Sequence, residues 1–158
     1  MYYILNYKIV KKALQTIIGA VDDLNVQNMN GKTALMYAAQ YSSDSLKLLI
    51  EARAHLNKQD KDGITALMYA ARYNSNSLKL LIDAGADINK QNRNGKVALM
   101  YAAHYRSGSL KPLIDAGADL NKQNKDGSTA LMFAAIHNSK SLKLLIDAGA
   151  DINKQNRN

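Results

Sequence analysis

The sequence repeats itself every 32 residues along most of its 158-residue length. Segments 60–91 and 124–155 are identical at 26 of 32 positions, and segments 28–59 and 92–123 follow the same pattern. A period of this size is the signature of an architecture in which each unit is too small to bury its apolar face alone. The repeat therefore predicts a solenoid, in which every unit stacks on the next one.

The same period predicts the organisation of the chain, which we take as one array over residues 1–158. Its full repeats are 28–59, 60–91, 92–123 and 124–155, and residues 156–158 open a fifth copy. Residues 1–27 match only in their second half, where the leucines and isoleucines fall in register, so we predict a divergent repeat there. We expect the chain to be a monomer. At its C-terminal end we expect an exposed stacking face that includes Leu131, Met132, Leu142 and Leu145.

Each repeat predicts two short helices. In the second full repeat, Thr65 can cap a helix over about 66–73, because its hydroxyl can accept from a free N–H of the first turn. Ser75 or Ser77 is the expected cap of the following helix, which presents a leucine stripe. Gly85 ends that helix, since glycine adopts positive φ without steric cost.

A polar segment rich in Asn and Asp separates one helix pair from the next. It closes with a glycine in every copy, for example Asn94-Gly95, which is turn or hairpin chemistry. Neither helix exceeds about ten residues, so neither is stable in isolation. The pattern predicts an all-α solenoid of helix-turn-helix units whose tips are β-hairpins or loops.

The run Gly-x-Thr-Ala-Leu-Met-x-Ala-Ala, followed by Leu-Lys-Leu-Leu-Ile-x-Ala-Gly-Ala-Asp-Ile-Asn, resembles the ankyrin repeat over residues 28–155. The copies depart from the family pattern in carrying Ala-Leu-Met for the usual Pro-Leu-His, which removes the Thr–His side-chain tie. The turn between the helices is one residue shorter than usual. Its customary glycine is replaced by Ser42, Asn74, Arg106 or Asn138, and we expect Arg106 to tolerate positive φ poorly.

Two repeats contain weak points. In the third, Val97 replaces the capping threonine and Pro112 falls in the second helix. We expect that helix to start after Ser109, which places the proline in its first turn, where the missing N–H costs little. In the first repeat, Arg53 stands where the other copies have the helix-ending glycine.

The residues give no support for a catalytic, metal or cofactor site, and we do not expect an enzyme. The absence of cysteine excludes disulfides, thiolate metal ligands and a cysteine nucleophile. Gly31-Lys32-Thr33 resembles the end of a phosphate-binding loop but lacks its first glycine, which would fall at Val26. The three histidines, His55, His104 and His137, are not at metal-binding helical spacing, and we interpret them as surface side chains.

Other recurring side chains have structural interpretations. We expect the methionines of the Ala-Leu-Met triplets to pack between repeats, and the residues that follow them, Tyr37, Tyr69, Tyr101 and Phe133, to be stacking contacts. Each second helix carries a lysine four residues before an acid, as in Lys111 and Asp115, which predicts a solvated outer face.

Variation among the copies indicates where a partner binds. Positions that pack the stack cannot vary freely, whereas exposed positions can. The variable positions fall at the end of the first helix and at the loop tip, which the ankyrin resemblance places along a concave groove. The predicted partner-binding residues are Gln40, Tyr41, Lys61, Ile64, Arg72, Tyr73, Arg93, Lys96, His104, Tyr105, Lys125, Ile136 and His137.

The favoured function is therefore a non-catalytic protein-interaction module that acts as a scaffold, adaptor or effector. The alternative is electrostatic binding to nucleic acid or an acidic surface, prompted by a net charge of +8. That charge is spread along the chain, and segment 60–91 contributes none of it, whereas a nucleic-acid site needs a dense basic stripe. The chain has no signal-like segment or membrane-spanning run, so we expect an intracellular, cytoplasmic protein, or a host-cytosolic one if it is an effector.

Overall fold

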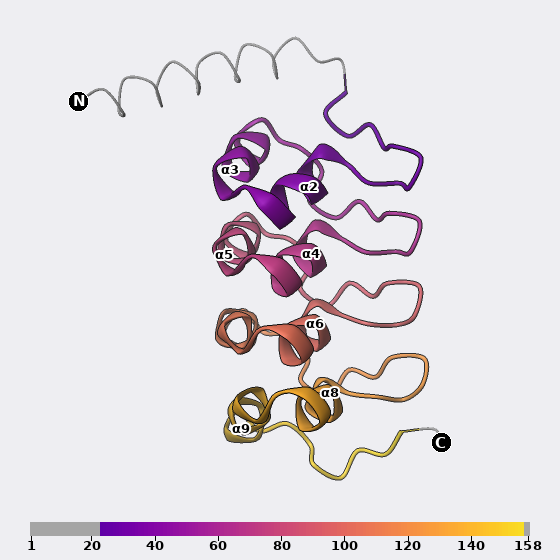
Figure 1. Cartoon of the computed structure of the whole chain (residues 1–158), viewed down its shortest axis with the longest axis vertical. Helices are drawn as coiled ribbons and strands as arrows, with labels where there is room; N and C mark the ends of the chain where they lie inside the picture. Colours follow the sequence, from indigo (N-terminus) through magenta and orange to yellow (C-terminus); the bar gives the residue numbers. More distant parts are fainter. Residues whose placement is uncertain (1–22, 157–158) are drawn as a thin grey trace, which may run out of the picture.

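The computed structural model describes residues 23–156, which form a stack of helix pairs joined by long loops (Figure 1). No residue of this range is in a β-strand. One row contains the inner helices, which lie beside the loops, and the other contains the outer helices. The inner helices are α2 (Ala34–Tyr41), α4 (Ala66–Tyr73), α6 (Ala98–Tyr105) and α8 (Ala130–His137), and the outer helices are α3 (Ser43–Glu51), α5 (Ser75–Asp83), α7 (Leu110–Asp115) and α9 (Ser139–Asp147).

The inner helices begin where the sequence predicts. Thr65 is the N-cap of α4, and its Oγ1 accepts from the N–H of Met68 at 3.3 Å. Val97 occupies the same position before α6 and makes no side-chain hydrogen bond. The missing cap does not shorten α6, because packing against the neighbouring inner helices holds it in place.

The outer helices begin differently from our prediction. Asn74, not Ser75 or Ser77, is the N-cap of α5, and its Oδ1 accepts from the N–H groups of Asn76 and Ser77 at 3.2 Å. Ser75 is already the first helical residue. Ser77 is fully buried, and its hydroxyl lies 3.1 Å from that of Ser43 in the preceding outer helix.

The short turn between the two helices also differs from our expectation. Asn74 has φ −149°, and so does Arg106, which is extended backbone open to any residue. This single residue ends one helix and begins the next. The turn therefore has no position that requires positive φ, and Arg106 is not strained there.

The third outer helix starts late, as predicted. Residues Ser107–Ser109 form a short 3₁₀-helix, η1, and α7 begins at Leu110. Pro112 is the third residue of α7, so its missing N–H removes no intrahelical bond. Ser109 occupies the N-cap position, but its buried hydroxyl makes no capping hydrogen bond and has no other hydrogen-bond partner among the described residues.

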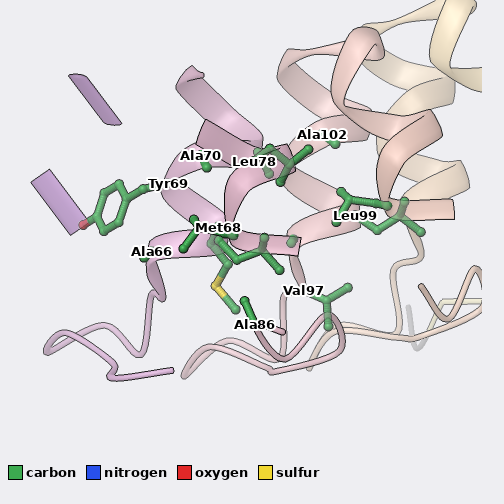
Figure 2. Close-up of a cluster of buried hydrophobic side chains, with 14 of the residues drawn as sticks. Ala66, Met68, Tyr69, Ala70, Leu78, Ala86, Val97, Leu99 and Ala102 are labelled. Atoms are coloured by element: carbon green, nitrogen blue, oxygen red, sulfur yellow. The ribbon is translucent and has the colours of Figure 1, made fainter. Parts of the chain in front are cut away.

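A continuous apolar core runs along the stack between the two rows of helices. Met36, Met68 and Met100 are each 1 % exposed, which confirms their packing role. Figure 2 shows Met68 extending toward Ala86, with Val97 close by. Burial of each such side chain contributes about 1.5–3 kcal/mol.

Polar side chains tie the successive loops together. Gln59 donates from Nε2 both to the carbonyl of Gly63 in its own loop and to that of Gln91 in the next. The same glutamine contact recurs along the whole row of loops, at a spacing of 32 residues. The loop glycines belong to this contact as well, since a Cβ on Gly63 would lie 2.6 Å from the backbone nitrogen of Arg93.

The C-terminal end of the stack is partly exposed. Leu145 is fully buried and Leu131 is 9 % exposed, so our expectation was wrong for these two leucines. Met132 and Leu142 are partly buried, whereas Ile146 and Ile152 are exposed. A hollow of about 310 Å³ is lined by Met132, Leu142, Ile146 and Ile152, together with Leu131. The predicted N-terminal repeat falls almost wholly in residues 1–22, outside the described range.

Candidate functional site

The predicted binding residues lie on one surface, which we call the inner face and define by those thirteen side chains. Eight of them end the inner helices, and the other five belong to the loops. None of the thirteen is buried. The most exposed large apolar members are Ile136 at 74 % and Tyr41 at 72 %.

Arg72 on this face contacts two tyrosine rings. Its guanidinium carbon is 4.8 Å from the ring centre of Tyr73 and 4.3 Å from that of Tyr105 in the next inner helix. A guanidinium at such distances is attracted to the ring electrons, with an energy of about 0.5–1 kcal/mol at an exposed site. The contact fixes the position of Arg72 across the boundary between two helix pairs.

His104 and His137 are brought together although 33 positions separate them in the sequence. Their ring centres are 3.7 Å apart and nearly parallel, and His104 also stacks on Tyr105 at 4.0 Å. Desolvation lowers the pKa of His104, and the charges of His137, Lys96 and Arg72 lower it further. The stack therefore favours a neutral imidazole at position 104.

Two lysines from the loops cover further rings. Lys96 Nζ lies 4.8 Å from the ring centre of Phe133, and Lys32 Nζ lies 4.4 Å from that of Tyr69. Lys32 was missing from the predicted set, although it precedes Ile64 and Lys96 in the same column of the repeat. Lys32 and Tyr69 form a separate pair. The other rings and cations are connected to one another, and we call them the cation–aromatic ladder: Arg72, Tyr73, Lys96, His104, Tyr105, Phe133 and His137.

The remaining predicted residues are not part of this ladder. Lys61, Arg93 and Lys125 hold the loop tips through their backbone, since each N–H donates at 3.0–3.1 Å to a carbonyl of the preceding loop. Their side chains are exposed. The other members have no ring contact among the described residues, and one of them, Ile64, packs partly against the core. These members are Gln40, Tyr41, Ile64 and Ile136.

We expected Tyr37, Tyr69, Tyr101 and Phe133 to be stacking contacts between repeats. Tyrosines of this column also form hydrogen bonds through their hydroxyl groups. Tyr69 donates its hydroxyl proton to Oδ2 of Asp60 at 2.7 Å, and Asn92 donates to the Tyr101 hydroxyl at 3.0 Å. The other oxygen of Asp60 accepts from the loop N–H groups of Asp62 and Ile64. Each such tie fixes a loop to its own inner helix.

Burial and hydrogen bonding shift the pKa values of these tyrosines. Burial raises the pKa of Tyr69, and its hydrogen bond to Asp60 raises that pKa further. Burial likewise raises the pKa of Tyr101. Both phenols are therefore protonated throughout the physiological range, as the hydrogen bond donated by Tyr69 requires.

The inner face and the outer helices differ in how their cations are compensated. On the outer side, Lys111 pairs with Asp115 at 3.0 Å and Lys143 with Asp147 at 3.4 Å, all four well exposed. These pairs confirm the solvated outer face. On the inner side, no carboxylate of residues 23–156 lies within 4.0 Å of the Arg72 or Lys96 charge.

The inner face encloses little volume beside the histidine stack. The cavity among Lys96, His104, Tyr105 and Phe133 measures about 20 Å³. Sites for small molecules usually enclose about 300–1,000 Å³. Within the described range, no group of three or more His, Cys, Asp or Glu side chains has a metal-binding arrangement.

Comparison with known proteins gives the family. The family model described as "Ankyrin repeats (3 copies)" matches residues 1–92 and 74–156. The chain belongs to the ankyrin repeat family. No curated protein matches the sequence.

Ankyrin repeats are generally protein–protein interaction modules and are typically non-catalytic. The family match spans overlapping stretches and does not delimit single repeats, so our boundaries for this ankyrin array stay a prediction. None of the helices described between residues 23 and 156 is long and apolar enough to cross a bilayer.

Proposed function

We propose that the chain is a non-catalytic scaffold, adaptor or effector module that captures a partner protein on its inner face. The observation that carries this proposal is the cation–aromatic ladder, in which rings and cations from three successive helix pairs contact one another on the inner face. Tyrosine and arginine are the residue types that dominate binding energy at protein interfaces. Their mutual stacking reduces the conformational entropy that they lose on binding.

The test uses the whole chain and a double variant, Tyr73→Ala with Tyr105→Ala. These rings are 36 % and 44 % exposed, so their removal leaves the core intact. Partner capture is measured by crosslinking. We expect the double variant to capture at least about 90 % less partner than the wild-type chain, because hot-spot truncations cost about 2 kcal/mol or more. Asn76→Ala with Lys140→Ala is the matched control on α5 and α9, where both side chains are exposed.

Thermal unfolding of both double variants separates binding from folding. Equal capture by the wild-type chain and the tyrosine variant, with both folded, would show that the inner face is not the binding surface. Equal loss from the outer-helix control would contradict it as well. For the compartment we propose an intracellular, cytoplasmic location, supported by the cysteine-free composition.

The electrostatic alternative, binding to nucleic acid, has weaker support. Two of the exposed loop tips carry an acid beside their lysine, Asp62 next to Lys61 and Asp126 next to Lys125. These acids interrupt the row of positive charge that a phosphate backbone would follow.

A further inference from the structure

We infer that the partner presents an extended segment rich in aspartate and glutamate to the inner face, where its carboxylates pair with Arg72 and Lys96. This inference rests on the proposed function and adds the chemical class of the partner. It is carried by three features of the face: cations without acids, a buried acid that is already hydrogen-bonded, and rings that hold Arg72 in place.

The first feature is the set of uncompensated cations. Arg72 makes contacts with rings but has no hydrogen bond or ion pair among residues 23–156. Lys96 lies over Phe133 and is also without a carboxylate there. Arg93, exposed in the same loop as Lys96, adds a third cation. A surface of this kind attracts a complementary negative segment.

The second feature is the state of the nearby acids. Asp60 is 7 % exposed, and its two oxygens are occupied by the Tyr69 hydroxyl and by loop N–H groups. Asp62 and Asp126 are exposed at the second and fourth loop tips. The third loop carries no acid from Asn92 to Val97, so no carboxylate of that segment offsets the charges of Arg93 and Lys96.

The third feature is the placement of Arg72. Its guanidinium carbon lies 4.8 Å and 4.3 Å from the centres of two rings, and its N–H groups have no acceptor among the described residues. Two of these N–H groups match the two oxygens of a carboxylate. Ile136 and Tyr41 on the inner face offer apolar surface for side chains between the acids of such a segment.

A segment of protein fits these features better than a nucleic acid. Arg72, Arg93 and Lys96 have no acid beside them in the sequence. Lys61 and Lys125, in contrast, each stand next to an exposed acid, Asp62 and Asp126. Isolated carboxylates can avoid these two acids, whereas the evenly spaced phosphates of a nucleic acid cannot.

The experiment selects binders from a random peptide display library on the whole chain. We expect the enriched peptides to be acidic, and one of them is then resynthesised in its original form and with every acid replaced by its amide. The original peptide should bind at least about tenfold more tightly than the amide form. Its affinity should fall between about 50 and about 300 mM salt, as expected of exposed charge pairs.

Variants locate the contact. Arg72→Gln with Lys96→Gln should weaken binding of the acidic peptide at least about tenfold. Lys79→Gln with Lys140→Gln removes the same charge from the outer helices and should leave binding unchanged. A single-stranded oligonucleotide serves as the competing polyanion. We expect it to compete weakly.

The outcomes separate this inference from the proposed function. If the selected peptides are neutral or basic and bind the wild-type chain but not the Tyr73→Ala with Tyr105→Ala variant, the inner face remains the binding surface. The inference that the partner segment is acidic would then be overturned. Peptides insensitive to both inner-face variants would overturn both proposals. Failure to enrich any acidic peptide, or tighter binding of the oligonucleotide, would also overturn the inference.

Discussion

The Tyr69 hydroxyl donates a 2.7 Å hydrogen bond to the carboxylate of Asp60, nine residues earlier in the chain. This contact joins an inner helix to the loop that precedes it. It stands in a repeat that lacks the Thr–His side-chain tie of the ankyrin pattern. In the last helix pair Phe133 replaces the tyrosine, and Asn124 directs its amide to Asp126.

Removal of that hydroxyl should destabilise the chain. Tyr69→Phe leaves one oxygen of the buried Asp60 without its donor, and we expect a loss of about 1.5–3 kcal/mol in the free energy of unfolding. The ring itself is tolerated, since Phe133 occupies the equivalent position. Chemical denaturation measures the change. Tyr37→Phe, at a ring that is 42 % exposed, is the control and should lose less; equal losses would show that the tie is not a buried charge-assisted bond.

A second prediction concerns Arg53, which has φ +63° at the end of α3. Arg53→Gly should raise the free energy of unfolding by about 0.5–1 kcal/mol, because glycine adopts this conformation without a Cβ penalty. The melting temperature checks it. The reverse change, Gly85→Ala, tests conformation alone, since a Cβ there meets no atom within 4 Å. Stabilisation by Gly85→Ala, or a lower melting temperature for Arg53→Gly, would contradict the argument.

The buried hydroxyl of Ser141 supplies a third prediction. It has no hydrogen-bond partner within the described part of the chain, so Ser141→Ala should stabilise by about 1 kcal/mol. Ser77 is its equivalent two copies earlier and lies 3.1 Å from the Ser43 hydroxyl. Ser77→Ala should therefore destabilise the chain. The two variants, compared by denaturant unfolding, should change stability in opposite directions, and a shared direction would refute the explanation.

The histidine stack predicts a dependence on pH. The pKa of His104 is lowered in the folded chain by desolvation and by His137, Lys96 and Arg72, so the unfolded chain binds a proton more readily. Stability from this group is therefore complete above the unfolded pKa of about 6.5 and is lost as pH falls through and below it. His104→Gln removes the titration. The wild-type chain should lose more stability than this variant between pH 7 and pH 5, and parallel losses would exclude the mechanism.

Much of the local structure could be predicted from the sequence. The helix start after Thr65, the late start of α7 before Pro112 and the glycine end of α5 follow from hydrogen-bonding and steric rules that act within a few residues. The prediction was wrong for the turn at Asn74, because it was based on the longer turn of the family pattern. In the shorter turn, one extended residue ends the first helix and begins the second.

Contacts between repeats could not be predicted in the same way. Sequence variation selected His104 and Arg72 as exposed positions, but not that His104 stacks on His137 or that Arg72 contacts two rings. Lys32 is not among the predicted binding residues, because its contact is with Tyr69, a ring in the following inner helix. Such contacts depend on how one helix pair lies against the next.

The sequence by itself determined the repeat, the helix pairs, the loop glycines and the column of buried methionines. It did so because capping, φ preference and apolar periodicity depend on residues close together in the chain. The tertiary structure decided which side chains meet across repeats: the tie from Tyr69 to Asp60, the paired histidines and the cations left without acids. Those relationships arise only when stacking fixes the distance between units, since residues about 32 positions apart have no contact until the solenoid forms.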